Sequence, residues 1–140
     1  MELTNNFDLD EFLQSRTADA NNYEEQYTPP DEVIENIRQL CINVLQPLRD
    51  ELGEGIHISS GYRCKRLNDK KKGAVNSDHM KGMAADIQFE LPNSLSNQIL
   101  FDKVIELGLP FRQLIDEKNY EWVHVSYNVN DNKKQILHLL

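Results

Sequence analysis

The chain is organised around two short stretches, Ser59-Ser60-Gly61-Tyr62-Arg63 and Ser77-Asp78-His79-Met80-Lys81-Gly82-Met83-Ala84-Ala85-Asp86. The first places an arginine at the end of an apolar strand, and the second places a histidine ahead of an aspartate. Further along, Glu121-Trp122-Val123-His124 supplies a second histidine. Two imidazoles and one carboxylate are the protein ligands of an open catalytic zinc site, whose fourth position is left to water. The sequence therefore predicts one zinc ion per chain with three ligands: His79, Asp86 and His124.

Two helices are expected on either side of these stretches. Thr28-Pro29-Pro30-Asp31 has the features of a helix start, and apolar residues recur at every third or fourth position from Val33 to Leu48. This pattern predicts one long helix that is kinked near Pro47 and ends at Gly53 or Gly55. A second helix is predicted from Leu95 to Leu107.

Alternation of apolar and polar residues predicts the strands. In the segment from Ala84 to Leu91, Ala85, Ile87 and Phe89 are expected to face the core, which leaves Asp86 on the opposite face, available to a cleft. A strand is also predicted from Ile56 into Gly61. Three further strands, all expected to be antiparallel, end the chain: Phe111–Ile115, Trp122–Val129 and Gln135–Leu139. These patterns predict an α+β fold, with helices packed on one face of a small, mainly antiparallel sheet.

Length and composition indicate a single soluble domain spanning residues 1–140, in which residues 1–28 form a partly ordered N-terminal segment. There is no apolar run long enough for a membrane span and no signal-peptide pattern, so the expected location as encoded is the cytoplasm. The net charge of -8 argues against nucleic-acid binding. The basic run at residues 70–72 is interpreted as a solvated turn in preference to a contact with an anionic substrate.

The motifs resemble the zinc D-alanyl-D-alanine carboxypeptidases of the peptidase M15 type, a family that includes D,D-dipeptidases and phage endolysins. Ser-Gly-Tyr-Arg, Ser-x-His-x6-Asp and Glu-x-x-His occur here in the order typical of that family. Segments such as Val44–Arg49, Gln113–Ile115 and Trp122–Tyr127 resemble its short phage and prophage branch. The sequence departs from the family pattern at Lys72-Gly73-Ala74, where a paired glycine is expected, and at Met83, where a glutamate is common.

The resemblance implies a fold shared with the hedgehog signalling domain, and it implies a general base. In the family, this base is the acidic residue three positions before the last histidine, which is Glu121 here. However, residues three apart on a regular strand point to opposite faces, so Glu121 can act on the metal only from a turn or a bulge. In a hairpin that turns at Lys118-Asn119, Glu117 lies on the His124 side. Glu121 is therefore the predicted base, which removes a proton from the metal-bound water and delivers it to the leaving amine, and Glu117 is the rival candidate. For both residues, the structural alternative is a solvated acid in the hairpin.

Three other residues are candidates for contacting substrate. Arg63 can stabilise the negative charge that develops on an attacked carbonyl, or bind a substrate carboxylate; its structural alternative is a salt bridge at a strand end. Ser77 resembles the family serine that contacts substrate, although a capping serine is the alternative. Trp122 shares a face with His124 by alternation, so it lines the cleft or packs in the core.

The resemblance implies a zinc metallopeptidase that hydrolyses a peptide bond in peptidoglycan stem peptides, of the D-Ala-D-Ala carboxypeptidase or the L,D-endopeptidase type. The chain is expected to be a monomer and to reach the cell wall by phage lysis machinery or another route. The alternative is a catalytically inactive zinc-binding module of the same fold. A cysteine hydrolase using Cys64 and a histidine is a third possibility, but no local motif supports it. Cys41 and Cys64 are both interpreted as free thiols.

Overall fold

The long amphipathic helix predicted after Pro30 is present in the computed structural model, which describes residues 1–140, as three consecutive segments. These are α3 (Asp31–Leu40), the π-helical turn η2 (Cys41–Leu45) and α4 (Gln46–Leu52). Pro47 lies in the first turn of α4 and cannot donate a backbone hydrogen bond. The widened turn η2 directly before it lets the helix continue, and Gly53, with a left-handed φ of 65°, ends it as predicted.

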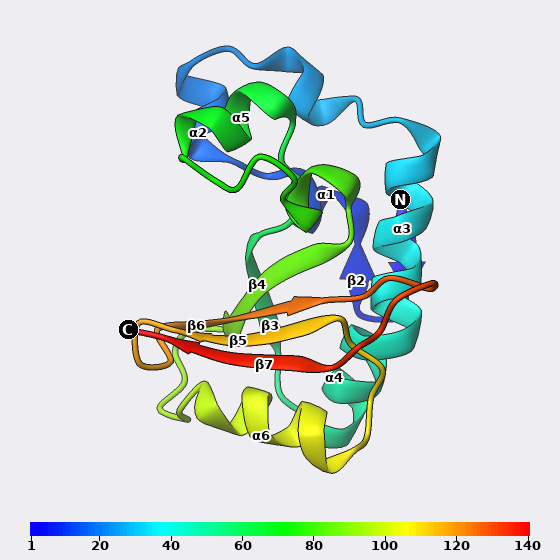
Figure 1. Cartoon of the computed structure of the whole chain (residues 1–140), viewed down its shortest axis with the longest axis vertical. Helices are drawn as coiled ribbons and strands as arrows, with labels where there is room; N and C mark the ends of the chain where they lie inside the picture. The colour runs from blue at the N-terminus through cyan, green and yellow to red at the C-terminus, as the bar shows by residue number, and fades with distance from the viewer.

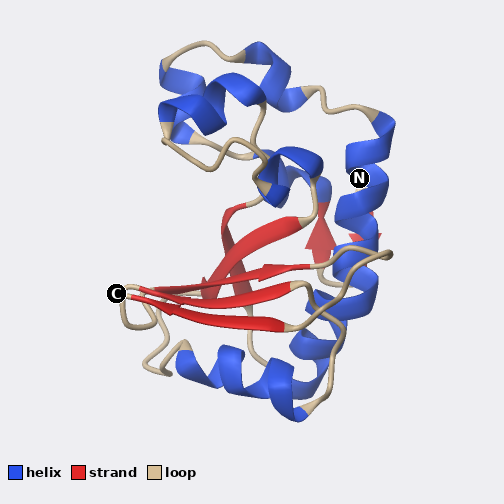
Figure 2. Ribbon diagram, in the orientation of Figure 1, coloured by secondary structure: helices blue, strands red, loops and turns tan.

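A five-stranded sheet lies beside this helix (Figures 1 and 2). Its strands follow the spatial order β3-β4-β6-β5-β7. Their bounds are β3 (Ile56–Ser60), β4 (Ala84–Phe89), β5 (Gln113–Glu117), β6 (Trp122–Ser126) and β7 (Gln135–Leu139). The three pairs β3–β4, β4–β6 and β6–β5 are antiparallel, which agrees with the predicted α+β class.

The prediction of three antiparallel strands at the end of the chain is wrong for the last one. β7 pairs with β5 in parallel, with Leu114 beside Ile136. The chain does reverse direction after β6, but β4 already occupies the outer edge of β6. The returning strand therefore pairs with the free edge of β5, which runs in the same direction as β7.

The two faces of the sheet have different surroundings. Ala85, Ile87 and Val123 point into a core that they share with α3, α4 and α6 (Gln98–Glu106), and these residues are fully buried. α6 lies at the opposite end of the molecule from the short helices α2 (Arg16–Ala20) and α5 (Lys65–Lys70) (Figure 1). The helices α3, α4 and α6 thus pack on one face of the sheet, as predicted, and Asp86 lies on the other face.

The N-terminal segment contains more structure than its polar composition indicates. A small hairpin, β1 (Glu2–Thr4) with β2 (Phe7–Asp8), leads into α1 (Leu9–Leu13), whose N-cap is Asp8. Asp8 accepts a hydrogen bond from the Asp10 backbone N–H, while its own N–H donates to the Glu11 carboxylate. The helix α2 and the 3-10 turn η1 (Glu24–Tyr27) follow. Phe12 and Ala18 are fully buried, so this segment is part of the core.

Candidate metal centre

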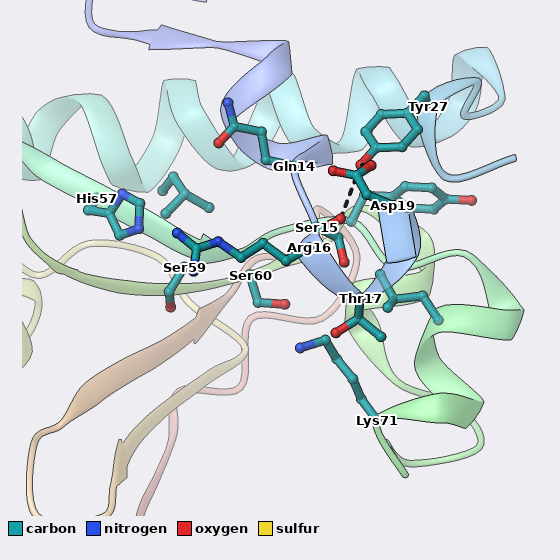
Figure 3. Close-up of a pocket in the computed structure, with 13 residues that line it drawn as sticks. Gln14, Ser15, Arg16, Thr17, Asp19, Tyr27, His57, Ser59, Ser60 and Lys71 are labelled. Carbon is teal, nitrogen blue, oxygen red and sulfur yellow. Dashed lines mark hydrogen bonds between the residues drawn. The ribbon is translucent and has the colours of Figure 1, made fainter. Parts of the chain in front are cut away.

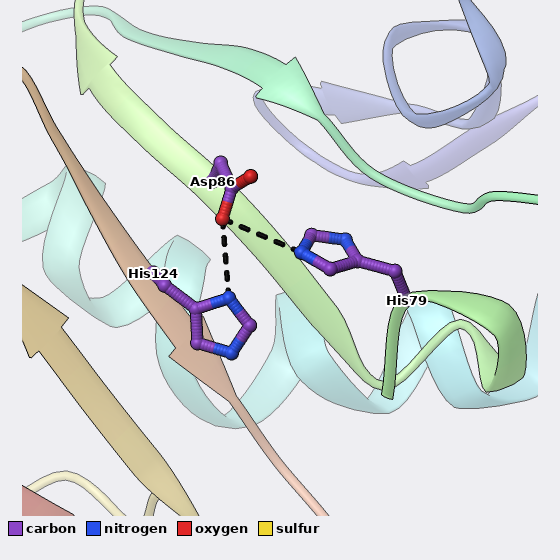
Figure 4. Close-up of side chains that lie close together, drawn as sticks. All are labelled: His79, Asp86 and His124. Atoms are coloured by element: carbon purple, nitrogen blue, oxygen red, sulfur yellow. Dashed lines mark hydrogen bonds and ion pairs between the residues drawn. The ribbon is translucent and has the colours of Figure 1, made fainter. Parts of the chain in front are cut away.

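Three side chains that the sequence singles out converge on the open face of the sheet. Asp86 on β4 lies directly opposite His124 on β6 in the antiparallel register, so both point to the same face. His79 comes from the 3-10 turn η3 (Asp78–Lys81), which leads into β4. One ligand atom from each of the three residues lies within 4.8 Å of the others (Figure 4).

The Asp86 carboxylate lies between the two imidazoles. Its Oδ1 atom is 3.1 Å from His124 Nδ1 and 3.4 Å from His79 Nε2. Burial of Asp86 acts to raise its pKa, but hydrogen bonds with His124 and then with His79 outweigh burial and lower it. Asp86 is therefore an ionised carboxylate in a buried position, which is the form that binds a metal.

The second ring nitrogen of His79 fixes the orientation of this side chain. His79 Nδ1 lies 2.7 Å from the Gly61 carbonyl oxygen, which can only accept a hydrogen bond, so Nδ1 carries the proton. Burial lowers the pKa of His79, an effect that its contacts with Asp86 oppose, and so favours the neutral ring. A neutral histidine whose outer nitrogen donates to a backbone carbonyl presents its other nitrogen as a metal ligand.

The donor set fits a zinc ion. His124 Nε2 is a buried side-chain atom with no hydrogen-bond partner, which is unusual for a native structure. Two imidazoles and one ionised carboxylate, all within reach of one ion, match the three protein ligands of open zinc sites. His79, Asp86 and His124 could therefore hold a metal in this position.

A cavity of about 670 Å³ opens over the three residues. Its walls come from β5, β6, the loop before η3 and the chain that follows β3. Four of the five other predicted site residues line it: Arg63, Ser77, Glu117 and Trp122. The structure thus brings these side chains to the same cavity as the candidate metal ligands.

The two candidate bases have different positions. Glu117 is paired with Trp122 in the β5–β6 register, so it shares a face with His124 and lines the cavity. Glu121 is exposed in the turn between these strands and does not line the cavity. Three consecutive residues with positive φ, Lys118, Asn119 and Tyr120, place Glu121 there.

The electrostatic surroundings of Glu117 also differ from those of an ordinary surface acid. Burial raises its pKa, and the negative charge of Asp86 raises it further. Glu117 is therefore a partly buried carboxylate close enough to the candidate ligand Asp86 to feel its charge.

A comparison with protein-family models gives one match. The model described as Peptidase M15 matches residues 5–126, which include every residue of the candidate site. The chain belongs to the peptidase M15 family. A search of curated proteins finds no match. Members of this family are in general zinc-dependent peptidases, in agreement with the donor set. No helix of this M15 peptidase has the length and apolar character needed to cross a membrane.

Arg63 is anchored on one side of the cavity of the M15 peptidase. Its Nε donates to Ser60 Oγ at 3.0 Å, and its Nη2 lies 3.4 Å from Asp86 Oδ2. The third contact, from Nη1 to Asn68 Oδ1, is long at 3.5 Å. The guanidinium is thus held beside the candidate metal ligands, while its Nη1 makes only a weak hydrogen bond within the chain.

Ser77 combines the two alternatives considered for it, whereas Trp122 takes only one of its two. Ser77 lines the cavity, and its Oγ also accepts a hydrogen bond from the His79 backbone N–H at 3.2 Å, which caps η3. Trp122 is half-buried and lines the cavity, with the Lys118 amino group 5.5 Å from its ring centre. Trp122 is therefore a wall of the cavity and does not belong to the core cluster.

Sequence reasoning missed one residue that organises the site of the M15 peptidase. Gln26 is fully buried, and its Nε2 donates to the carbonyl oxygens of Leu13 at 2.9 Å and Tyr62 at 2.8 Å. Its Oε1 accepts from the Cys64 backbone N–H at 2.9 Å. Gln26 thus fixes the backbone on both sides of Arg63. A glutamine in a polar segment gives no sequence signal of this role, because its partners are backbone atoms.

Proposed function

We propose that the chain is a zinc-dependent metallopeptidase that hydrolyses a peptide bond in peptidoglycan stem peptides, as a D-Ala-D-Ala carboxypeptidase or an L,D-endopeptidase. The observation that carries this proposal is the position of Glu117, a carboxylate that faces the same cavity as the candidate ligands His79, Asp86 and His124. Metal ligands and a free base in one cavity are the requirements of metal-assisted peptide hydrolysis.

His79, Asp86 and His124 are proposed to bind zinc. When bound, zinc supplies Lewis-acid chemistry that polarises a carbonyl group and makes water a stronger acid. The contact between His79 Nδ1 and the Gly61 carbonyl keeps the metal-binding nitrogen of this ring unprotonated. Arg63 Nη2, near Asp86 Oδ2, keeps the second carboxylate oxygen oriented.

Glu117 is proposed to be the general base, in place of Glu121, which the sequence favours, because Glu117 lines the cavity and Glu121 does not. A carboxylate oxygen of Glu117 takes a proton from the attacking water and then delivers it to the nitrogen of the leaving amine. Burial and the charge of Asp86 raise the pKa of Glu117, which makes its carboxylate a better proton acceptor than an exposed one. Glu121 is exposed and does not line the cavity, which supports the choice of Glu117.

Arg63 is proposed to stabilise the oxyanion that forms on the attacked carbonyl. Its guanidinium is fixed by Ser60 and Asp86, so its position needs little reorganisation during the reaction. Trp122 and Ser77 line the same cavity and are proposed to contact the peptide on either side of the scissile bond.

The test is to measure metal content and peptide cleavage on the same protein. Elemental mass spectrometry of protein purified without chelator is expected to give about one zinc per chain, and His79→Ala is expected to lose it. Mass spectrometry of stem peptides incubated with the zinc-loaded protein is expected to show one new pair of products. Zinc binding with no cleavage of any stem peptide would instead support the inactive zinc-binding module.

A further inference from the structure

A second cavity, of about 660 Å³, shares no lining residue with the metal cavity. It is bounded by β3, by the residues around the start of α2 and by Lys71 after α5 (Figure 3). Ser60 lines this second cavity, and its Oγ accepts the hydrogen bond from Nε of Arg63, which lines the metal cavity. One hydrogen bond between lining residues therefore links the walls of the two cavities.

Two cationic side chains face this second cavity, which we name the Arg16–Lys71 cavity. Figure 3 shows Arg16 extended beside Ser59 and Ser60, while the Lys71 amino group points toward the same strand. Neither Arg16 nor Lys71 forms an ion pair or a side-chain hydrogen bond within the chain. By contrast, the neighbouring cations Lys65 and Arg66 are paired, with Asp69 and Glu25 respectively.

The remaining lining of the Arg16–Lys71 cavity offers donors and little negative charge. Asp19 is its only carboxylate, and it already accepts a hydrogen bond from the Tyr27 hydroxyl. The Thr17 hydroxyl also lines the cavity and has no partner within the chain, and the Ser60 hydroxyl still has its own proton to donate. Unpaired cations together with free hydroxyl donors form a site for an anion.

The position of these cations is notable because the chain as a whole is acidic, with a net charge of -8. Two lysines of the run at residues 70–72 line different cavities: Lys71 lines the Arg16–Lys71 cavity and Lys72 lines the metal cavity. A positively lined region next to the reaction site would attract an anionic substrate that the rest of the surface repels.

We propose that the Arg16–Lys71 cavity is a substrate subsite that binds a carboxylate of the stem peptide at a distance from the bond that is cut. This inference rests on the proposed function and adds to it a specificity: peptides with a free side carboxylate are preferred over the same peptides in which that group is amidated. A planar guanidinium matches a carboxylate by paired hydrogen bonds, and the Lys71 ammonium adds a point charge.

The test compares two stem peptides that differ only in one group, the free or amidated carboxylate of their glutamate residue. Binding is measured by calorimetry on the zinc-loaded Glu117→Gln variant, so that cleavage does not interfere. The free carboxylate is expected to bind about tenfold more tightly. Arg16→Ala and Lys71→Ala are each expected to reduce this preference about threefold or more. Lys70→Ala, an exposed neighbour that lines neither cavity, is the matched control and keeps the full preference.

The outcomes separate the subsite from the proposed function. If the unsubstituted enzyme cleaves both peptides and the two peptides bind with equal affinity, the subsite is overturned and the proposed function stands. A preference that depends on Arg16 and Lys71, without cleavage, would support the subsite and count against the function. Absence of binding by either peptide would overturn the subsite. Glycerol 3-phosphate and acetate are also compared as competitors of the free-carboxylate peptide. If glycerol 3-phosphate displaces the peptide at a lower concentration than acetate does, the carboxylate assignment is overturned in favour of a phosphate-bearing wall polymer.

Discussion

Asp86 and His124 lie directly opposite each other on neighbouring antiparallel strands, and Asp86 Oδ1 is 3.1 Å from His124 Nδ1. Their meeting depends on the register of β4 and β6, because a shift by one residue would turn either side chain to the other face. The core packing of Ala85 and Ile87 on β4, and of Val123 and Val125 on β6, holds this register. The apolar residues of these strands therefore help to build the metal centre.

Zinc is expected to stabilise the folded chain. A ligand that binds only the native state adds about 2.7 kcal/mol to the free energy of unfolding when its concentration is about a hundred times Kd. Calorimetric melting with zinc and with chelator is expected to show a higher Tm with zinc for the unsubstituted chain and no difference for Asp86→Asn. His138→Gln is the control, because His138 lies outside the cluster and is largely exposed. An unchanged zinc response in Asp86→Asn would exclude Asp86 as a ligand.

The two candidate bases can be separated by matched substitutions. Glu117→Gln removes the proposed proton acceptor and is expected to lower kcat by about a hundredfold or more. Glu121→Gln makes the same chemical change at the exposed position and is expected to leave kcat within about twofold. Steady-state kinetics on a stem peptide and zinc content measure both effects. The assignment is wrong if the two variants exchange these results.

The protonation of Glu117 is expected to report on the metal. In the metal-free chain, burial and the charge of Asp86 raise the pKa of Glu117 above its ordinary value of 4.5. A positive ion at His79, Asp86 and His124 favours the charged carboxylate, so zinc is expected to lower this pKa again. Carbon-13 NMR of the side-chain carboxyl group, assigned with Glu117→Gln, gives the pKa with and without zinc. Equal pKa values in the two states would place Glu117 away from the metal.

Removal of the Gln26 amide is expected to destabilise the chain. Gln26→Leu leaves the Leu13 and Tyr62 carbonyls and the Cys64 N–H buried without partners, which costs on the order of 3 kcal/mol. Gln98→Leu, at an exposed position on α6, makes the same change without that loss. Urea unfolding of both variants measures the free energies. Equal stabilities would mean that Gln26 does not secure the Arg63 segment.

Much of the fold is predictable because its strands and long helix have regular apolar patterns. The alternation around Asp86 correctly predicts which residues of β4 face the core, and the apolar repeat after Pro30 predicts the long helix to its glycine end. The pairing of β7 was not predictable in this way, because its residues alternate equally well beside β5 in either direction. What decides its direction is that β4 occupies the edge of β6.

The candidate metal ligands were recognisable from motif spacing, whereas the surroundings of the site were not. The positions of Glu117 and Glu121 depend on a turn in which Lys118, Asn119 and Tyr120 all adopt positive φ. Lysine and tyrosine seldom adopt this conformation, so no sequence rule predicts such a turn. The contacts of Gln26 were similarly hidden, because they join segments that are far apart in the chain.

The contacts of the N-terminal segment set a lower limit on the size of any engineered version. The Gly61 carbonyl orients His79. Gly61 packs so closely against Phe12 that a Cβ added to Gly61 would lie 2.7 Å from the Phe12 backbone. The Phe12 carbonyl also accepts a hydrogen bond from the Tyr62 N–H. A fragment trimmed to begin at the long helix would retain every candidate metal ligand but lose the frame that aligns one of them. Grafting this centre onto another scaffold would require transplanting residues 7–27 with it.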